Sequence, residues 1–301
     1  MTDIQTLISP DISVTLAPVP KRQRIWEIDF LRGACVVMML LDHLCLLFSE
    51  KMFGGAWIDY GNISQSTRDF LVWCTQFRDG DLHNRIRIAV LCLFIIISGI
   101  SCSFSRSNLK RGGILAAVAL AYTGASYLAE NVLGMRGFHV DFGVLHFYAS
   151  CILFYALIEI ACRHNTVAKA VVALAVMVVV VCLYYLYTPP ADTPIWLAPV
   201  FPYTDAHGNP ATFYNRADFS PGDICNLIPY AACFFAGTAL GPVLYPRRYS
   251  LLPFLDGKWT LPLGFLGRYA IFVYILHAVV LTVVLALVSV LFVTPGSWGI
   301  I

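Results

Sequence analysis

The chain has 301 residues, of which 58% are hydrophobic and only 13% charged, and its mean hydropathy is +0.72. This composition excludes a soluble globular domain and is typical of an integral membrane protein. The formal net charge of +2 is modest, and the basic residues follow a membrane topology, so the sequence does not indicate nucleic-acid binding.

Residues 1–20 have neither the basic segment nor the cleavage site of a signal peptide, and we expect them to form a disordered tail. Residues 21–301 then form one transmembrane domain. It contains seven apolar runs, each long enough to cross ~30 Å of hydrocarbon as a helix. The runs lie at 28–48, 88–104, 113–134, 142–162, 166–187, 225–245 and 266–293. We therefore predict an all-α, polytopic transmembrane helix bundle of about seven spans.

The basic residues predict how this bundle is oriented. When the seven spans alternate, thirteen of the twenty Lys and Arg fall on one side, which is then the cytoplasmic side. The prediction is a multi-pass protein of the inner (plasma) membrane, with the N-terminus in the cytoplasm and the C-terminus outside. Two long connections, 49–87 and 188–224, lie outside, and the first contains STRDFLVWCTQF, whose apolar spacing predicts an interfacial amphipathic helix.

The first span carries charged and titratable residues inside an apolar run. Asp29 and Arg32 stand at its cytoplasmic end, and Asp42 and His43 lie deep within it. Such groups are costly in hydrocarbon and are usually retained for chemistry or transport. Arg32 and His43 are eleven residues apart, which places them within ~20° of one helix face and ~16 Å apart along the axis. One face of this helix therefore joins the cytoplasmic surface to the membrane interior.

Three histidines fall within predicted spans: His43, His146 and His277. By their depths all three can meet in the outer half of the bilayer, where a neutral imidazole can act as a general base and Asp42 or Asp141 can orient or charge one of them. The alternative for each is a core histidine that is hydrogen-bonded to a neighbouring helix. Zinc ligation is a further alternative, but no i,i+4 pair or carboxylate triad frames a site, and we expect no metal.

The cytoplasmic connection after the second span, SGISCSFSRSNLKRGG, combines serines with cations before another helix begins. Hydroxyls, exposed amides and cations suit a phosphate group. The residues concerned are Ser98, Ser101, Arg106, Lys110 and Arg111. The alternative is that the cations are ordinary charges of the cytoplasmic side.

Five segments, taken in order, carry a family resemblance: RIWEIDFLRG, SGISCSFSRSNLKRG, FGVLHF, DICNLIPY and FLGRYAIFVYILH. Through them the chain resembles bacterial membrane proteins related to the heparan-alpha-glucosaminide N-acetyltransferase catalytic domain. The Arg32-to-His43 spacing also resembles the Arg-x10-His motif of membrane acyltransferases that acylate surface sugars, in which the His is taken as catalytic.

The resemblance implies an acyltransferase that moves an acyl group, expected to be acetyl, from cytoplasmic acyl-CoA to a sugar or glycan acceptor. CoA phosphates would lie near Asp29, Arg32 and the basic connection, and His43 would be the general base, with Asp42, His146 and His277 beside it. The implied partners are the lipid bilayer, acetyl-CoA as co-substrate and the glycan, and a homo-oligomer remains open. Two alternatives also remain: a proton-coupled transporter, which broken helices would favour, and a non-catalytic membrane scaffold.

Overall fold

The computed structural model describes residues 25–49, 64–133, 140–163, 165–187, 197, 199–201 and 223–292, so the predicted tail at 1–20 lies outside the described residues. In chain order the elements are α1 (Trp26–Leu47), α3 (Gln65–Asp79), α4 (Asp81–Ser103), α5 (Asn108–Leu133), β1 (Val140–Phe142), α6 (Val144–Cys162), α7 (Thr166–Leu186), β2 (Asp223–Ile224), α8 (Leu227–Leu244), the 3₁₀ turns η3 (Pro253–Leu255) and η4 (Lys258–Thr260), α9 (Leu261–Arg268) and α10 (Ala270–Phe292).

The predicted all-α polytopic bundle is confirmed, because most of the described residues in each of the seven apolar runs are helical. Five helices are individually long and apolar enough to cross a membrane: α1, α4, α6, α7 and α8. The pair Lys258–Arg268 and Ala270–His277 supplies a sixth span if it is counted as one, although it is bent by 64°. The third predicted run lies in the 26-residue α5, which has Lys110 and Arg111 in its first turn. Among the described residues, the chain is thus a multi-pass membrane protein with five or six evident spans.

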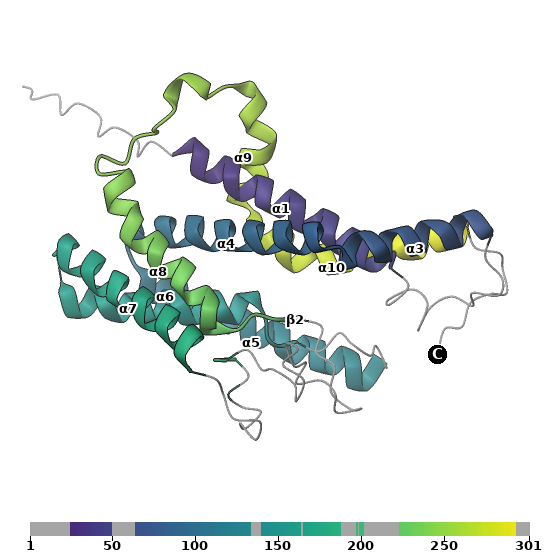
Figure 1. Cartoon of the computed structure of the whole chain (residues 1–301), viewed down its shortest axis with the longest axis horizontal. Coiled ribbons are helices and arrows are strands. Elements are labelled where there is room, and N and C mark those ends of the chain that lie inside the picture. Colours follow the sequence, from purple (N-terminus) through teal and green to yellow (C-terminus); the bar gives the residue numbers. More distant parts are fainter. Residues whose placement is uncertain are drawn as a thin grey trace, which may run out of the picture.

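Contacts between the helices show their relative directions. Arg32 near the start of α1 meets Ser101 near the end of α4, and Asp42 farther along α1 meets His83 at the start of α4, so these helices are antiparallel. His43 meets His277, whereas Arg32 meets Gly267 just before α10, so α1 and α10 run in the same direction. Figure 1 shows α1, α4 and α10 extending along the long axis of the molecule, as alternating spans would.

Close helix packing in the bundle centre depends on two glycines. A methyl group on Gly99 of α4 would overlap the carbonyl oxygen of Phe234, and one on Gly237 of α8 would overlap that of Ile96. Backbones that approach so closely leave no room for a Cβ, and small residues permit such contacts between transmembrane helices. The core beside this crossing is apolar and includes the fully buried Phe147 of α6 and Phe234 of α8.

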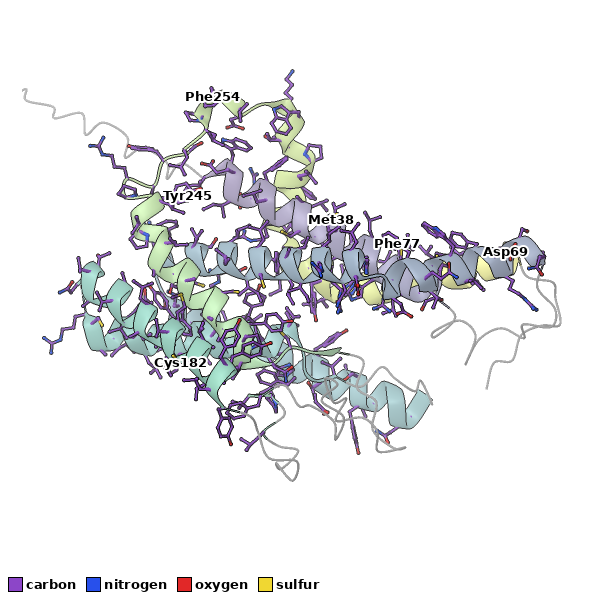
Figure 2. All side chains as sticks on the ribbon, viewed as in Figure 1. Met38, Asp69, Phe77, Cys182, Tyr245 and Phe254 are labelled. Carbon is purple, nitrogen blue, oxygen red and sulfur yellow. The ribbon has the colours of Figure 1, made fainter. Side chains whose placement is uncertain are left out.

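The outer surface of α7 is apolar as well. Its exposed side chains include Val171, Val179 and Leu186, and Figure 2 shows Cys182 on the same helix. A soluble protein rarely exposes such a continuous apolar surface, whereas hydrocarbon tails cover it without penalty. The surface of α7 therefore fits a helix that faces lipid.

The last predicted span, 266–293, differs from the structure because the helix is broken at its start. The predicted span runs through FLGRYAIF as one helix, yet α9 ends at Arg268 and α10 begins at Ala270 in another direction. The start of α1 holds the segment before α9. Glu27 accepts a hydrogen bond from the Leu251 amide at 2.5 Å, and Trp26 donates to the Leu252 carbonyl at 3.2 Å. Phe254 lies on the protruding part of this connection (Figure 2).

The STRDFLVWCTQF segment forms a helix, α3, that packs on another helix. Ser64 caps it by accepting from the Thr67 amide, and Leu71 and Cys74 are buried. Figure 1 shows α3 continuing roughly along the line of α4. Its Phe70, Trp73 and Phe77 remain about half exposed, so α3 also presents aromatic side chains to its surroundings, and its place at the membrane interface stays a prediction. The two-residue β2, at the end of the connection between α7 and α8, pairs in parallel with β1, which lies just before α6.

Candidate active site

A cluster of polar residues lies where α1 crosses the break between α9 and α10. Asp29 is at its centre, with Oδ1 at 3.4 Å from Arg32 Nη1 and Oδ2 at 3.3 Å from Arg268 Nε. Arg32 also donates from Nη1 to the Gly267 carbonyl at 3.4 Å and from Nη2 to Ser101 Oγ at 2.5 Å. We call these five residues the inner cluster. It joins α1, α4 and α9 through one carboxylate and two guanidinium groups.

Two glycines permit this arrangement. A Cβ on Gly33 would overlap the Leu263 carbonyl oxygen, and one on Gly267 would overlap that of Asp29. The backbones of α1 and α9 therefore touch at this point. Arg32 precedes Gly33 in the chain and Arg268 follows Gly267, so both arginines lie beside the contact. Small residues at the crossing let the arginine side chains reach the same carboxylate.

The predicted phosphate-binding connection lies next to the inner cluster through Ser101. Its cations, Arg106, Lys110 and Arg111, are exposed. Asn108 between them is buried and donates to the Cys102 carbonyl and to Glu159 Oε2, each at 2.9 Å. The buried amide anchors the connection to α6, so the cations project from a fixed turn. Ser98 donates to the Phe94 carbonyl in its own helix at 2.8 Å.

A second group of polar residues lies around His43, eleven residues after Arg32 in α1. It consists of Asp42, His43 and His277, and we call it the outer cluster. The rings of His43 and His277 meet edge to face, with centroids 4.8 Å apart. Nδ1 of His43 is 2.8 Å from the Met39 carbonyl, and Nδ1 of His277 contacts the Tyr274 carbonyl. A carbonyl only accepts hydrogen bonds, so in each neutral ring Nδ1 carries the proton and Nε2 keeps its lone pair.

Asp42 connects the outer cluster to the end of α3 and the start of α4. Its Oδ1 is 3.1 Å from His83 Nε2 and 3.7 Å from Arg78 Nε, and its Oδ2 is 3.8 Å from His43 Nδ1. His83 also makes a second contact, because its Nδ1 is 3.0 Å from the Arg78 carbonyl oxygen. The sequence did not single out His83 or Arg78, because they lie outside the apolar run that drew attention to His43.

His146 has different neighbours from the other two histidines. Its Nε2 is 3.2 Å from Thr123 Oγ1 of α5, and its ring packs against Phe142 of β1. Thr123 also donates to the Val140 carbonyl at 2.8 Å. The contacts of the described residues thus bring together His43 and His277, and they place His146 with the α5–α6 pair. The predicted meeting of all three histidines is seen for two of them.

The two clusters on α1 offer different chemical groups. The inner cluster offers guanidinium donors suited to an anion, and the outer cluster offers imidazole bases beside a carboxylate. In the part of the chain that the structure describes, no three His, Cys, Asp or Glu side chains are grouped so as to hold a metal ion.

The family model described as heparan-alpha-glucosaminide N-acetyltransferase, catalytic, matches residues 24–279, well over half of the chain and every residue of both clusters. Comparisons with curated proteins and with solved structures gave no match.

Proposed function

The chain belongs to the heparan-alpha-glucosaminide N-acetyltransferase catalytic family, and from this premise we propose that it moves an acetyl group from cytoplasmic acetyl-CoA to a sugar or glycan acceptor across the inner membrane. The observation that carries the proposal is the pair of clusters on one face of α1. Arg32 and His43 are ~16 Å apart along the helix, which suits a long donor with phosphates at one end and a thioester at the other.

The phosphates of the donor would bind on the cytoplasmic side. Arg106, Lys110 and Arg111 are exposed there on the turn that Asn108 anchors, beside Arg32 and Ser101 of the inner cluster. Guanidinium groups form charge-assisted, often bidentate, hydrogen bonds with phosphate oxygens. Asp29 would orient the arginines for this role.

The thioester would then reach the outer cluster. His43 Nε2 would take the proton from the acceptor hydroxyl or amine as its oxygen or nitrogen attacks the thioester carbonyl. The C–S bond breaks as the tetrahedral intermediate collapses, and the proton passes from His43 to the departing CoA thiolate. His277 would share or relay this proton through its own Nε2, and Asp42 would hold His83 and Arg78 around the cluster. The proton balance closes for a hydroxyl acceptor without another reactant.

Acetyl transfer by the purified protein tests this proposal. Wild type and the His43→Ala and His146→Ala variants are supplied with acetyl-CoA labelled in the acetyl group and with an amino-sugar acceptor, and labelled product is counted. A general base contributes ~10²- to 10⁴-fold, so His43→Ala should lose that much rate while it still binds acetyl-CoA. His146→Ala, away from the pair, should lose far less. Wild-type turnover by His43→Ala would refute the base assignment, and no transfer by wild type to any sugar would refute the activity.

Proton-coupled transport is a second candidate, and the break between α9 and α10 specifically favours it. Transporters place ion and substrate sites at broken transmembrane helices, and this break lies within the inner cluster. Proteoliposomes with an imposed pH gradient distinguish the two functions. Sugar accumulation that needs the gradient but not acetyl-CoA would favour transport, whereas acetylated sugar in the lumen would favour the transferase.

A further inference from the structure

The two arginines of the inner cluster differ in how far the protein already occupies them. The Arg32 side chain is 16% exposed, and both of its terminal amines are bonded to Asp29, Gly267 or Ser101. The Arg268 side chain is 42% exposed and contacts Asp29 through Nε alone. Within the described residues, neither terminal amine of Arg268 has a partner. The capacity to bind a further anion is therefore concentrated on Arg268.

The balance of charges in the inner cluster also indicates that an anion can bind at Arg268. One carboxylate, Asp29, faces two guanidinium groups, so the cluster carries an excess positive charge. A phosphate group that binds here would balance the excess cations. A guanidinium held by Nε presents its two terminal amines as a fork, which fits two oxygens of one phosphate.

The fork lies at the break in the last span. Arg268 is the last residue of α9, and the chain bends by 64° before α10 continues. The close crossing of α1 with α9 at Gly33 and Gly267 places the Arg268 side chain beside Asp29. The bend places the amino end of α10, a 23-residue helix whose dipole adds a partial positive charge, next to Arg268 in the chain.

We infer that Arg268 is the phosphate-binding arginine of the donor site and contacts a phosphate of CoA through Nη1 and Nη2. Arg32 is then a positioning residue, which holds Asp29 and the crossing of α1 with α9. This assignment rests on the proposed function, since it takes CoA as the donor. It was not predicted from the sequence, in which Arg268 counts only as one of the cytoplasmic charges.

Binding measurements with two ligands test the assignment. Calorimetry of the full-length protein in detergent gives the affinity for CoA and for S-acetyl-pantetheine, which carries the thioester arm but no phosphate. Arg268→Gln should weaken CoA binding about 10- to 100-fold, as expected for lost charge-assisted hydrogen bonds, and leave S-acetyl-pantetheine binding unchanged. Arg268→Lys keeps the charge but not the fork and should fall between Arg268→Gln and wild type.

A matched control removes a cation from the same side of the membrane without touching the cluster. Arg247 is exposed in the connection between α8 and α9, and Arg247→Gln should change CoA affinity less than twofold, within the small effect of an exposed charge. Equal CoA affinity in Arg268→Gln and wild type would overturn the role of Arg268 but not the proposed function. So would an equal loss for both ligands, which indicates a disrupted fold. If wild type binds no CoA, the proposed function fails, and the assignment of Arg268 fails with it.

Discussion

Replacement of Gly267 by Ala tests whether α1 and α9 cross as closely as the structure places them. The added methyl would overlap the Asp29 carbonyl oxygen and lie 2.9 Å from the Gly33 nitrogen. Both are backbone atoms, which cannot rotate away, so the helices must separate. Overpacking a close-packed site costs about 1–3 kcal/mol, and the backbone contacts place this substitution at about 3 kcal/mol. At roughly 2–4 °C for each kcal/mol, the melting temperature should fall by roughly 6–12 °C.

Gly264 provides the control within the same helix. Nothing lies within 4 Å of a Cβ built there, so Gly264→Ala should be neutral or should gain up to ~1 kcal/mol from the higher helix propensity of Ala. The assay is thermal unfolding in one detergent at one protein concentration, followed by tryptophan fluorescence. CoA affinity should fall with Gly267→Ala as well, because Arg268 moves with α9. If Gly267→Ala and Gly264→Ala both have the melting temperature of wild type, α1 and α9 do not cross as closely as the structure places them.

Three further outcomes are expected. In a background without other reactive cysteines, Lys110→Cys should react with an impermeant maleimide only from the cytoplasmic side and Gln76→Cys only from outside. Labelling of Lys110→Cys in intact cells would reverse the predicted orientation. Glu159→Ala leaves the buried Asn108 amide with one partner fewer and should cost about 1–3 kcal/mol in unfolding experiments, and an unchanged melting temperature would contradict the anchoring role. Burial, followed by the neighbouring Cys45, raises the pKa of the Cys74 thiol, so less of it is thiolate at neutral pH. Alkylation of Cys74 should therefore be slower than that of Gln76→Cys and should accelerate as pH rises, and equal rates near neutral pH would show that the thiol is exposed.

Helix positions were well predicted because they depend on local properties. An apolar run of ~20 residues becomes a helix wherever it lies in hydrocarbon, since every backbone amide must be bonded within the segment. The predicted start of the second span was late, at 88, whereas α4 begins at Asp81. Its first turns carry Asp81, His83 and Arg85, and a hydropathy criterion excludes such residues from a span even where the helix continues through them.

The sequence by itself determined that this is a multi-pass helical membrane protein of an acyltransferase family, and that Arg32 and His43 share one face of the first helix, because the helical period places residues eleven apart in line. Only the tertiary structure decided what each of them meets. Arg32 contacts Gly267, 235 residues away in the chain, and the close crossing of α1 with α9 brings a second guanidinium, that of Arg268, to Asp29. Contacts between distant segments depend on how closely two backbones approach and at what angle, and neither hydropathy nor spacing along one helix contains that information.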